Sequence, residues 1–158
     1  MAENEIGWIG FQPEVVVSSG NPEAEKYGRM WTHPQYRIVA PGEDVAQIFL
    51  QQAKPKPGSD VLDFGCGTGR GALALAVFGG VRVTMLDFVN NSLDDEVRQA
   101  LTTQAHLLRF VKHDLEQPLT MKAEYGFCTD VMEHIPPEKV GRVLDNILMA
   151  ARHVFFQI

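Results

Sequence analysis

The chain reads Val61-Leu62-Asp63-Phe64-Gly65-Cys66-Gly67-Thr68-Gly69 at the point that decides its fold. The first four residues form a short, mostly apolar run, which is typical of a buried β-strand. The three glycines that follow permit positive φ angles and let a ligand approach the backbone without a Cβ in the way. A helix is expected next, at 70–78, so the glycines lie in a strand-to-helix turn. The start of a helix presents free N–H groups and a positive dipole end, which suit a carboxylate or a phosphate.

Strands and helices alternate on the C-terminal side of this turn. We expect strands at 81–86, 107–112, 125–131 and 153–157, helices at 92–104 and 137–151, and a loop at 116–122. Short apolar strands that alternate with helices indicate a parallel sheet covered on both faces, and right-handed crossovers wind it in two directions. We therefore predict an α/β fold with a doubly wound, Rossmann-like, mostly parallel sheet.

The N-terminal side of the turn divides into two parts. A helix is expected at 41–53, because Pro41 suits a first helical position and Val45, Ile48 and Phe49 follow helical spacing. Residues 1–40 differ from the rest, with a short strand at 14–18, a helix at 23–30 and aromatic residues that follow no clear period. We divide the chain into an N-terminal arm, residues 1–40, and a single α/β domain, residues 41–158.

Composition excludes several classes of function. The 158 residues suffice for one domain, and the formal net charge of −6 argues against general binding to nucleic acid. There is no apolar run long enough for a membrane span and no basic-then-apolar start typical of a secretory signal. Cys66 and Cys128 lack the spacing of a zinc site or a disulfide framework, which fits a reducing cytoplasmic location.

The glycines alone leave the ligand open. The segment 67–72 satisfies the G-x-G-x-x-A form of the dinucleotide fingerprint, and the glycines could also simply make a tight turn. Asp87, at the end of the second strand, suits a ribose hydroxyl in a dinucleotide and in S-adenosylmethionine alike. Asp63 favours S-adenosylmethionine over a dinucleotide, because a carboxylate repels a nearby pyrophosphate and attracts a cationic ammonium or sulfonium group.

From Val61 onward the sequence resembles the class I S-adenosylmethionine-dependent methyltransferases. Four segments carry the resemblance in the order of that family, namely VLDFGCGTG at 61–69, MLDF at 85–88, VKHDL at 111–115 and TDVMEHIP at 129–136. The resemblance implies S-adenosylmethionine as the cofactor, with Asp87 on the ribose, Asp114 on the adenine amine and the Leu115 backbone on a ring nitrogen. The implied cofactor residues are Asp63, Gly65, Cys66, Gly67, Thr68, Gly69, Asp87, Phe88, Asp114, Leu115, Thr129 and Asp130.

Glu133 and His134 are the candidate catalytic residues. Histidine has a reference pKa near neutrality, so His134 is suited to take a proton from an acceptor hydroxyl or amine. An alternative is that His134 caps the loop or covers the cofactor. Asp130, Glu133 and His134 also resemble part of a magnesium-binding pattern, but His153 begins a strand where it does not supply the missing ligand, so we predict no metal.

The resemblance implies a methyltransferase that acts on an oxygen or nitrogen of a small-molecule acceptor. A non-catalytic module that binds S-adenosylmethionine or another partner, and a Rossmann protein that binds a nicotinamide dinucleotide, remain alternatives. By analogy with the family, Tyr27, Trp31 and Tyr36 form a lid, and Arg37 pairs with the methionine carboxylate.

The resemblance breaks at the C-terminal end. The family's sheet has seven strands, whereas this one is expected to be truncated after the fifth strand, at 153–157. A shortened chain, a minimal domain and a pocket completed by another subunit all remain open. An edge ending in Phe155 and Phe156 would favour association with another chain, and a homo-oligomer is one form of this.

Overall fold

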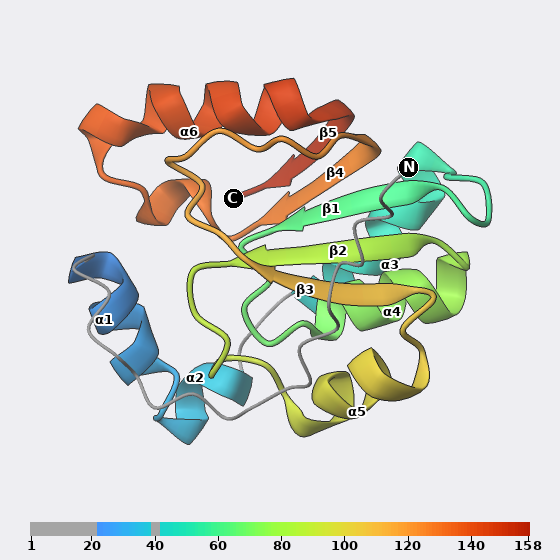
Figure 1. Cartoon of the computed structure of the whole chain (residues 1–158), viewed down its shortest axis with the longest axis horizontal. Helices are drawn as coiled ribbons and strands as arrows, with labels where there is room; N and C mark the ends of the chain where they lie inside the picture. The colour runs from blue at the N-terminus through green and yellow to red at the C-terminus, as the bar shows by residue number, and fades with distance from the viewer. Residues whose placement is uncertain (1–21, 39–41) are drawn as a thin grey trace, which may run out of the picture.

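A computed structural model of the chain describes residues 22–38 and 42–158 (Figure 1). The strand expected at 14–18 lies outside the described residues. The strands are β1 Asp60–Phe64, β2 Arg82–Asp87, β3 Leu108–Lys112, β4 Ala123–Thr129 and β5 Ala151–Gln157. The helices are α1 Pro22–Met30, α2 Pro34–Ile38, α3 Gly42–Ala53, α4 Arg70–Gly79, α5 Asp95–Thr103 and α6 Pro137–Ala150, with a short 3-10 helix η1 Met132–His134.

The five strands form one sheet in the order β3-β2-β1-β4-β5, and every pairing in it is parallel. The predicted α/β, doubly wound Rossmann-like fold is therefore confirmed. The chain winds from β1 to β3 in one direction and then crosses back to β4 on the other side of β1. Ligands of such sheets bind outside the carboxyl ends of the strands, where the winding direction changes. In Figure 1 the arrowheads of β1 and β2 point toward α1, so α1 lies near that end.

Each face of the sheet buries its own apolar core. Alternate residues of β1 point to opposite faces, so Val61 packs with α3, α4 and α5, while Leu62 packs with α6. On the first face the ring of Phe49 from α3 contacts the rings of Phe127 and Phe155, with centroids 5.5 and 5.8 Å apart. On the second face the loop between β3 and β4, expected at 116–122, contributes Leu119 beside α6. Figure 1 shows α6 along one side of the sheet and α4 and α5 along the other.

Four predicted boundaries are wrong by two or three residues. Two of them are strand starts, since β4 begins at Ala123 instead of 125 and β5 at Ala151 instead of 153. The other two have local reasons. The helix expected from 92 begins only at Asp95, because Asp94 has an extended backbone with φ −72° and ψ 154°. The strand expected to reach 131 ends at Thr129, because Asp130 adopts φ +50°, which no strand residue does. In addition, the helix at 34–38 was not expected within the arm.

The fifth strand follows α6 directly. Within the described residues it pairs only with β4, so its other edge is unpaired. Its phenylalanines are partly buried on opposite faces, since Phe155 stacks on Phe127 with centroids 5.9 Å apart and Phe156 packs in the α6 core. At this edge the backbone N–H and C=O groups of β5 are therefore unpaired in the described chain, whereas the rings of Phe155 and Phe156 pack against neighbouring residues.

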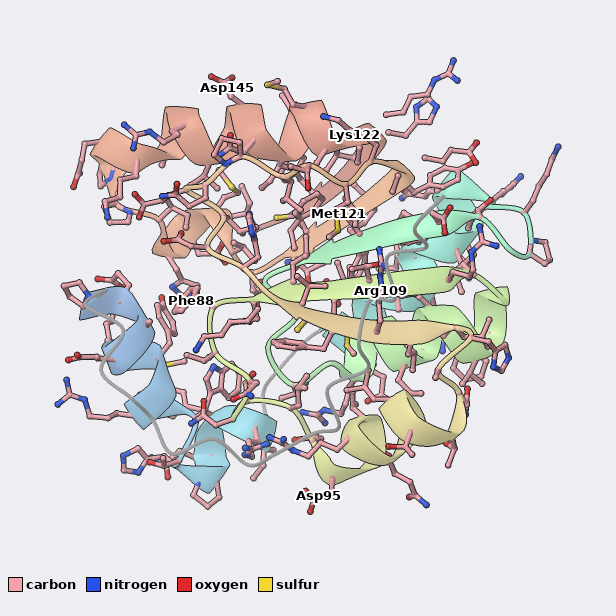
Figure 2. All side chains as sticks on the ribbon, viewed as in Figure 1. Phe88, Asp95, Arg109, Met121, Lys122 and Asp145 are labelled. Atoms are coloured by element: carbon pink, nitrogen blue, oxygen red, sulfur yellow. The ribbon has the colours of Figure 1, made fainter. Side chains whose placement is uncertain are left out.

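Figure 2 shows Phe88 at the carboxyl end of the sheet, beside α1, away from the labelled Lys122 near the far end of α6. The ring of Phe88 lies 5.6 Å from that of Tyr27 in α1, measured between centroids. Lys122 donates a hydrogen bond to the Met149 carbonyl at 2.6 Å and so ties the β3–β4 loop to α6. The described part of the arm thus packs on the end of the sheet where a ligand is expected.

Candidate functional site

The turn after β1 requires its glycines. Gly65 and Gly69 have φ values of +72° and +76°, in the left-handed region that residues with a Cβ rarely adopt. A Cβ on Gly65 would lie 2.5 Å from Cγ2 of Val131, and one on Gly69 would lie 2.7 Å from Cγ1 of Val97. Both contacts are too short for a real Cβ. The turn therefore needs glycine for two reasons, the positive φ angles and the lack of room for a side chain.

Hydrogen bonds within the protein hold this turn in place. The N–H groups of Gly65 and Cys66 donate to the Leu86 carbonyl at 2.8 and 3.1 Å. The N–H of Gly67 donates to the Asp87 carboxylate at 3.1 Å, and that of Gly69 donates to the Cys66 carbonyl. These four donors are therefore engaged before any ligand arrives, which leaves the turn rigid and less suited to bind an anion than its sequence indicated.

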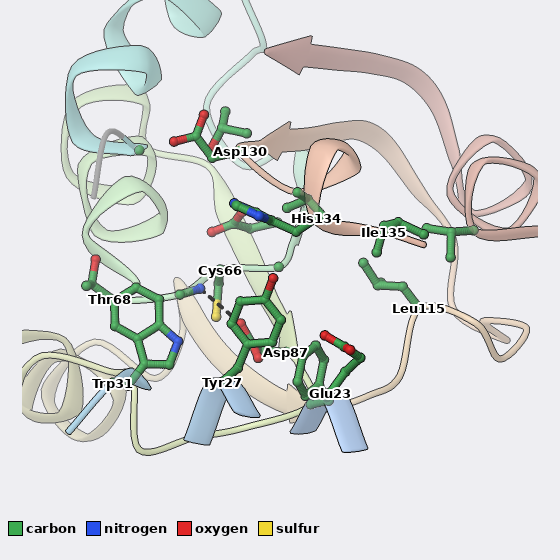
Figure 3. Close-up of a pocket in the computed structure, with 18 of the residues that line it drawn as sticks. Glu23, Tyr27, Trp31, Cys66, Thr68, Asp87, Leu115, Asp130, His134 and Ile135 are labelled. Atoms are coloured by element: carbon green, nitrogen blue, oxygen red, sulfur yellow. Dashed lines mark hydrogen bonds between the residues drawn. The ribbon is translucent and has the colours of Figure 1, made fainter. Parts of the chain in front are cut away.

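A cavity of about 260 Å³ lies between this turn, the ends of the neighbouring strands and α1 (Figure 3). Of the predicted cofactor residues, those lining it are Asp63, Gly65, Cys66, Gly67, Thr68, Asp87, Phe88, Asp114, Leu115, Thr129 and Asp130. Gly69 does not line the cavity, because it packs against Val97 on the opposite side of the turn. His134 lines the cavity, whereas Glu133 does not.

The charged residues of the cavity wall are acidic. Its carboxylates are Glu23, Asp63, Asp87, Asp114, Glu116 and Asp130. Among the described residues that line it there is no Lys or Arg. In a site shielded from water this arrangement favours a cationic ligand and opposes an anionic one.

Asp63 is the most deeply buried of these carboxylates. Its side chain is 3% exposed, and no hydrogen bond to it occurs within the described part of the chain. Burial, and then the charge of Asp87, raises the pKa of Asp63 to about 8. A buried acid without a partner is costly, so its presence at the cavity indicates a ligand that supplies the missing charge.

Asp87 is buried but has hydrogen-bond partners. Its carboxylate accepts hydrogen bonds from the N–H groups of Gly67 and Val89, at 3.1 and 3.0 Å. Burial raises the pKa of Asp87 to about 6, and these backbone hydrogen bonds oppose the rise. The two N–H groups fix the orientation of the carboxylate at the end of β2.

Residues of α1 and the segment after it cover the cavity. Tyr27 contacts Phe88 and also His134, with ring centroids 6.0 Å apart in the second pair. Trp31 lies against the glycine turn, 3.4 Å from where a Cβ of Gly67 would be. Figure 3 shows both rings projecting into the cavity from the α1 side. These side chains, together with Tyr36, line the cavity as expected for lid residues.

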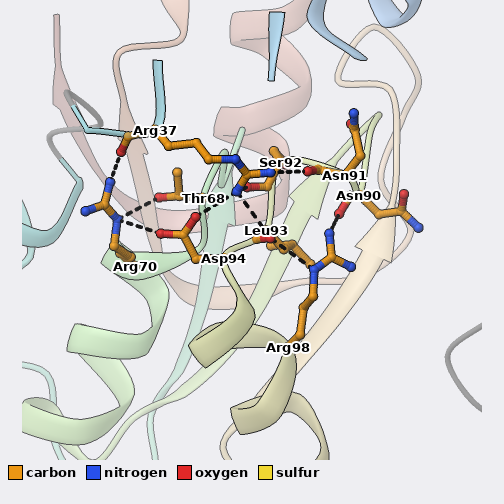
Figure 4. A network of polar contacts seen from close by, with 9 residues as sticks. All are labelled: Arg37, Thr68, Arg70, Asn90, Asn91, Ser92, Leu93, Asp94 and Arg98. Atoms are coloured by element: carbon orange, nitrogen blue, oxygen red, sulfur yellow. Dashed lines mark hydrogen bonds and ion pairs between the residues drawn. The ribbon is translucent and has the colours of Figure 1, made fainter. Parts of the chain in front are cut away.

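Arg37 occupies a different place from the one expected. Its guanidinium donates to the Asn91 and Ser92 carbonyls at 2.6 and 2.8 Å and to the Asp94 carboxylate at 2.8 Å (Figure 4). Arg70 also binds Asp94, at 3.1 Å, and donates to the Arg37 carbonyl. Arg37 does not line the cavity, so this geometry does not support its pairing with a ligand carboxylate; it holds the arm to the β2–α5 loop.

The end of β4 brings the predicted catalytic residues to the cavity rim. Burial, followed by the charge of Glu133, raises the pKa of Asp130. Glu133 and His134 lie on η1 and are exposed, with His134 turned toward Tyr27. In Figure 3 His134 lies across the cavity from Trp31 and Thr68. His134 at this rim is accessible both from the cavity and from the solvent, as a proton acceptor requires.

Sequence reasoning missed several residues of the wall. Glu23 and Met30 come from α1, and Glu116, Ile135 and Pro136 come from the loops after β3 and β4. Ile135 and Pro136 were within the segment that carried the family resemblance, so that segment held a signal for them. The expected lid implied that the segment with Tyr27 and Trp31 lies over the site, but no signal in the sequence singled out Glu23.

Neither a metal centre nor a membrane span is evident in residues 22–38 and 42–158. There, no three His, Cys, Asp or Glu side chains gather as metal ligands would. The helices in these ranges are too short or too polar to cross a membrane.

Comparisons with known proteins agree with this fold. The family described as "Methyltransferase domain" matches residues 61–153, and a comparison with curated protein sequences finds no match. Among solved structures, the DhpI–SAH complex is 19% identical with a TM-score of 0.63, covering 85% of this chain and 67% of that one. Magnesium protoporphyrin IX methyltransferase from Synechocystis PCC 6803 with bound SAH is 23% identical with a TM-score of 0.61, covering 83% of this chain and 64% of that one.

Coclaurine N-methyltransferase bound to N-methylheliamine and SAH is 17% identical with a TM-score of 0.61, covering 73% of this chain and 35% of that one. The chain thus spans about one third to two thirds of the length of these proteins. At these identities the likeness concerns the fold. The family match, by contrast, covers more than half of the 158 residues and begins at the strand before the glycine turn. The chain belongs to the class I S-adenosylmethionine-dependent methyltransferase family.

Proposed function

We propose that this chain binds S-adenosylmethionine in the acidic cavity and transfers a methyl group to an oxygen or nitrogen of a small-molecule acceptor. The observation that carries the proposal is Asp63, a buried carboxylate without a hydrogen-bond partner in the described residues, in a wall without Lys or Arg. A ligand with ammonium and sulfonium charges compensates this carboxylate. Family membership and the SAM and SAH complexes of similar folds support the same choice.

The residues of the cavity fit the parts of this cofactor. Asp87, held by the N–H groups of Gly67 and Val89, would accept hydrogen bonds from the ribose hydroxyls. Asp114 and the Leu115 backbone would bind the adenine, beside the ring of Phe88. The remaining predicted residues, namely Asp63, Cys66, Thr68, Thr129 and Asp130, would surround the methionine part.

The bound cofactor supplies an activated methyl group, and the protein supplies alignment, exclusion of water and a route for a proton. Tyr27 and Trp31 cover the cavity and reduce its contact with solvent. His134 would take a proton from the acceptor at the rim. Glu133, its neighbour on the same short helix, is the second predicted catalytic residue.

A nicotinamide dinucleotide is a poorer ligand for this cavity. Four N–H groups of the glycine turn already donate within the protein, and the nearby charges are carboxylates that oppose a pyrophosphate. A non-catalytic module would bind the cofactor through the same contacts as an enzyme. Only a measurement of turnover distinguishes the two.

Calorimetry and an acceptor screen test the proposal. We expect S-adenosylmethionine and S-adenosylhomocysteine to bind at one site per chain and NAD⁺ not to bind. Product formation with a small-molecule acceptor supports the enzyme, whereas cofactor binding without turnover on any acceptor favours the module. Binding of NAD⁺ in place of S-adenosylmethionine would contradict the proposal.

Compartment and assembly are part of the same proposal. Both cysteines, Cys66 and Cys128, are unpaired thiols, which fits a reducing compartment such as the cytoplasm. The unpaired backbone edge of β5 is the surface at which a second chain would associate. Light scattering over a range of concentrations tests this association.

A further inference from the structure

The loop after β3 presents a backbone hydrogen-bond donor at the cavity. Leu115 is 6% exposed and lines the wall, with its side chain beside that of Ile135 (Figure 3). Within the described part of the chain the N–H group of Leu115 donates no hydrogen bond, although buried N–H groups are almost always paired. A ligand in the cavity would supply the missing acceptor, provided that this N–H group is held in the right direction.

One peptide group of this loop is held from two sides. The N–H of the peptide between Leu115 and Glu116 donates to the Asp114 carboxylate at 3.0 Å. The carbonyl of the same peptide accepts a hydrogen bond from the side-chain amide of Asn146, in α6, at 2.8 Å. The Asp114 carboxylate, which lines the cavity, is thus oriented by a peptide that α6 holds in place. A shift of this peptide would move both the carboxylate and the adjoining Leu115 N–H.

The contact with Asn146 lies on the face of α6 that meets the loop. Lys139, Val143 and Asn146 are spaced four and three residues apart, so they share one face of the helix. In Figure 1 the loop between β3 and β4 runs along α6. Val143 is fully buried and lines the cavity, and Asn146 is 9% exposed. Lys139 pairs with Glu116 at 2.8 Å, in a more exposed position than Asn146.

An amide is an uncommon choice at this buried position. The buried residues of α6 are Val143, Asn146, Ile147 and Ala150, and three of the four are apolar core residues. Burying an amide costs free energy unless it is hydrogen-bonded, and leaving the Leu115 carbonyl without a donor would also be costly. Asn146 is therefore the main contact through which α6 fixes the loop, and the exposed Lys139 pair contributes less.

We propose that Asn146 is a positioning residue for adenine recognition: through the Leu115 carbonyl it fixes the Asp114 carboxylate and the Leu115 N–H that distinguish adenine from other purines. The assignment rests on the proposed function and deepens it, because Asn146 itself lies outside the cavity wall. Adenine offers a donor at its amine and an acceptor at the adjacent ring nitrogen, which match a carboxylate and an N–H group. Hypoxanthine reverses both, with a carbonyl and a ring N–H, so it is opposed by both groups.

The test compares two ligands that differ only at this edge of the purine, S-adenosylhomocysteine and S-inosylhomocysteine, each titrated by calorimetry. The wild type should bind the adenosyl compound about a hundredfold or more tighter, because the inosyl compound leaves the polar groups of the site without matching partners. Asn146→Leu, which has a similar size but lacks the amide donor, should weaken the adenosyl compound by about tenfold. It should change the affinity for the inosyl compound by less than about twofold, since that compound does not use the contacts that Asn146 fixes.

Three further variants separate this effect from a general loosening of the loop. Asn146→Asp, nearly isosteric and without a donor when ionised, makes the same test if Asn146→Leu does not fold. Lys122→Met is the matched control, because Lys122 donates from the far end of the same loop to the Met149 carbonyl of α6 at 2.6 Å. It should leave the ratio of the two affinities unchanged, and Lys139→Met should lower that ratio by less than about threefold. Circular dichroism and urea denaturation show whether each variant is folded.

Failure of this inference is distinct from failure of the proposed function. Equal losses for the two compounds in Asn146→Leu, or no loss for either, would overturn the positioning role while the cofactor assignment stands. Equal affinities of the wild type for the two compounds, or a fall of the ratio in Lys122→Met as large as in Asn146→Leu, would overturn it as well. If S-adenosylhomocysteine does not bind to the wild type, the proposed function is wrong and this inference falls with it.

Discussion

Replacing Asp63 by Asn should remove a pH dependence from the stability of the ligand-free protein. Burial and the charge of Asp87 raise the pKa of Asp63 to about 8 in the folded state, against about 3.9 in an unfolded chain. Between these two values the folded protein binds a proton that the unfolded chain has lost. Stability is therefore greatest at low pH and falls as pH rises through about 8.

The size of the effect follows from the proton that the folded state retains. Integrating one bound proton with a pKa of about 8 from pH 6 to pH 8 gives a loss of about 2.3 kcal/mol in the free energy of unfolding. Asp63→Asn lacks this loss, so relative to wild type it should gain about 2.3 kcal/mol between pH 6 and pH 8. Comparing the two pH values cancels any effect of the Asn side chain on packing.

Urea denaturation of the ligand-free protein at pH 6 and pH 8 measures this difference. Asp60→Asn is the matched control, because Asp60 lies on the same strand but is exposed and binds Arg82 at 2.8 Å. The Asp60→Asn variant should keep the wild-type dependence over this range, because the Arg82 hydrogen bond outweighs burial and lowers the pKa of Asp60. If wild type and Asp63→Asn lose the same stability between pH 6 and pH 8, Asp63 is not the buried acid described here.

Three further predictions concern the turn, the arm and the proton acceptor. Gly69→Ala should lower the free energy of unfolding by about 1–3 kcal/mol, because the φ of Gly69 is +76° and Val97 blocks the new Cβ. Gly141→Ala in α6 has open space for its Cβ and should raise the free energy of unfolding by about 0.5–1 kcal/mol. Urea titrations measure both changes. Arg37→Ala should speed hydrogen exchange in 22–38 by freeing the arm from its loop, while cofactor affinity changes less than tenfold; exchange as slow as in wild type would contradict the anchoring role. His134→Gln should lower product formation by about 10²–10⁴-fold with S-adenosylhomocysteine affinity retained, and wild-type turnover would exclude it as the proton acceptor.

Local sequence pattern predicted the sheet and most of the cavity. The strand at 61–64 and the glycine turn were recognisable because an apolar run and positive-φ residues leave few alternatives. Asp63, Asp87 and Asp114 lie at or just after the carboxyl ends of three strands of a parallel sheet, so their meeting at one end followed from the fold. The structure brings all three to the same cavity.

Features that depend on contacts distant in sequence were not predictable in this way. Arg37 binds residues 54 to 57 positions away, and no local signal distinguishes those partners from a ligand carboxylate. Glu23 was not predicted for the same reason, because it reaches the cavity wall only through the packing of α1 on the end of the sheet. Asp130 with φ +50° was missed because Asp tolerates both strand and left-handed conformations.

Proton-linked binding of S-adenosylmethionine shows whether a buried acid in this cavity meets a cationic cofactor. Calorimetric titrations at pH 7.5 in two buffers of different ionisation enthalpy give both the affinity and the number of protons released. With a pKa of about 8, Asp63 is mostly protonated at this pH, so binding of the cation should release about 0.8 proton. Asp63→Asn should bind more weakly and release close to none. Absence of binding, or wild-type binding with no proton released, would show that Asp63 does not meet a cationic ligand in this cavity.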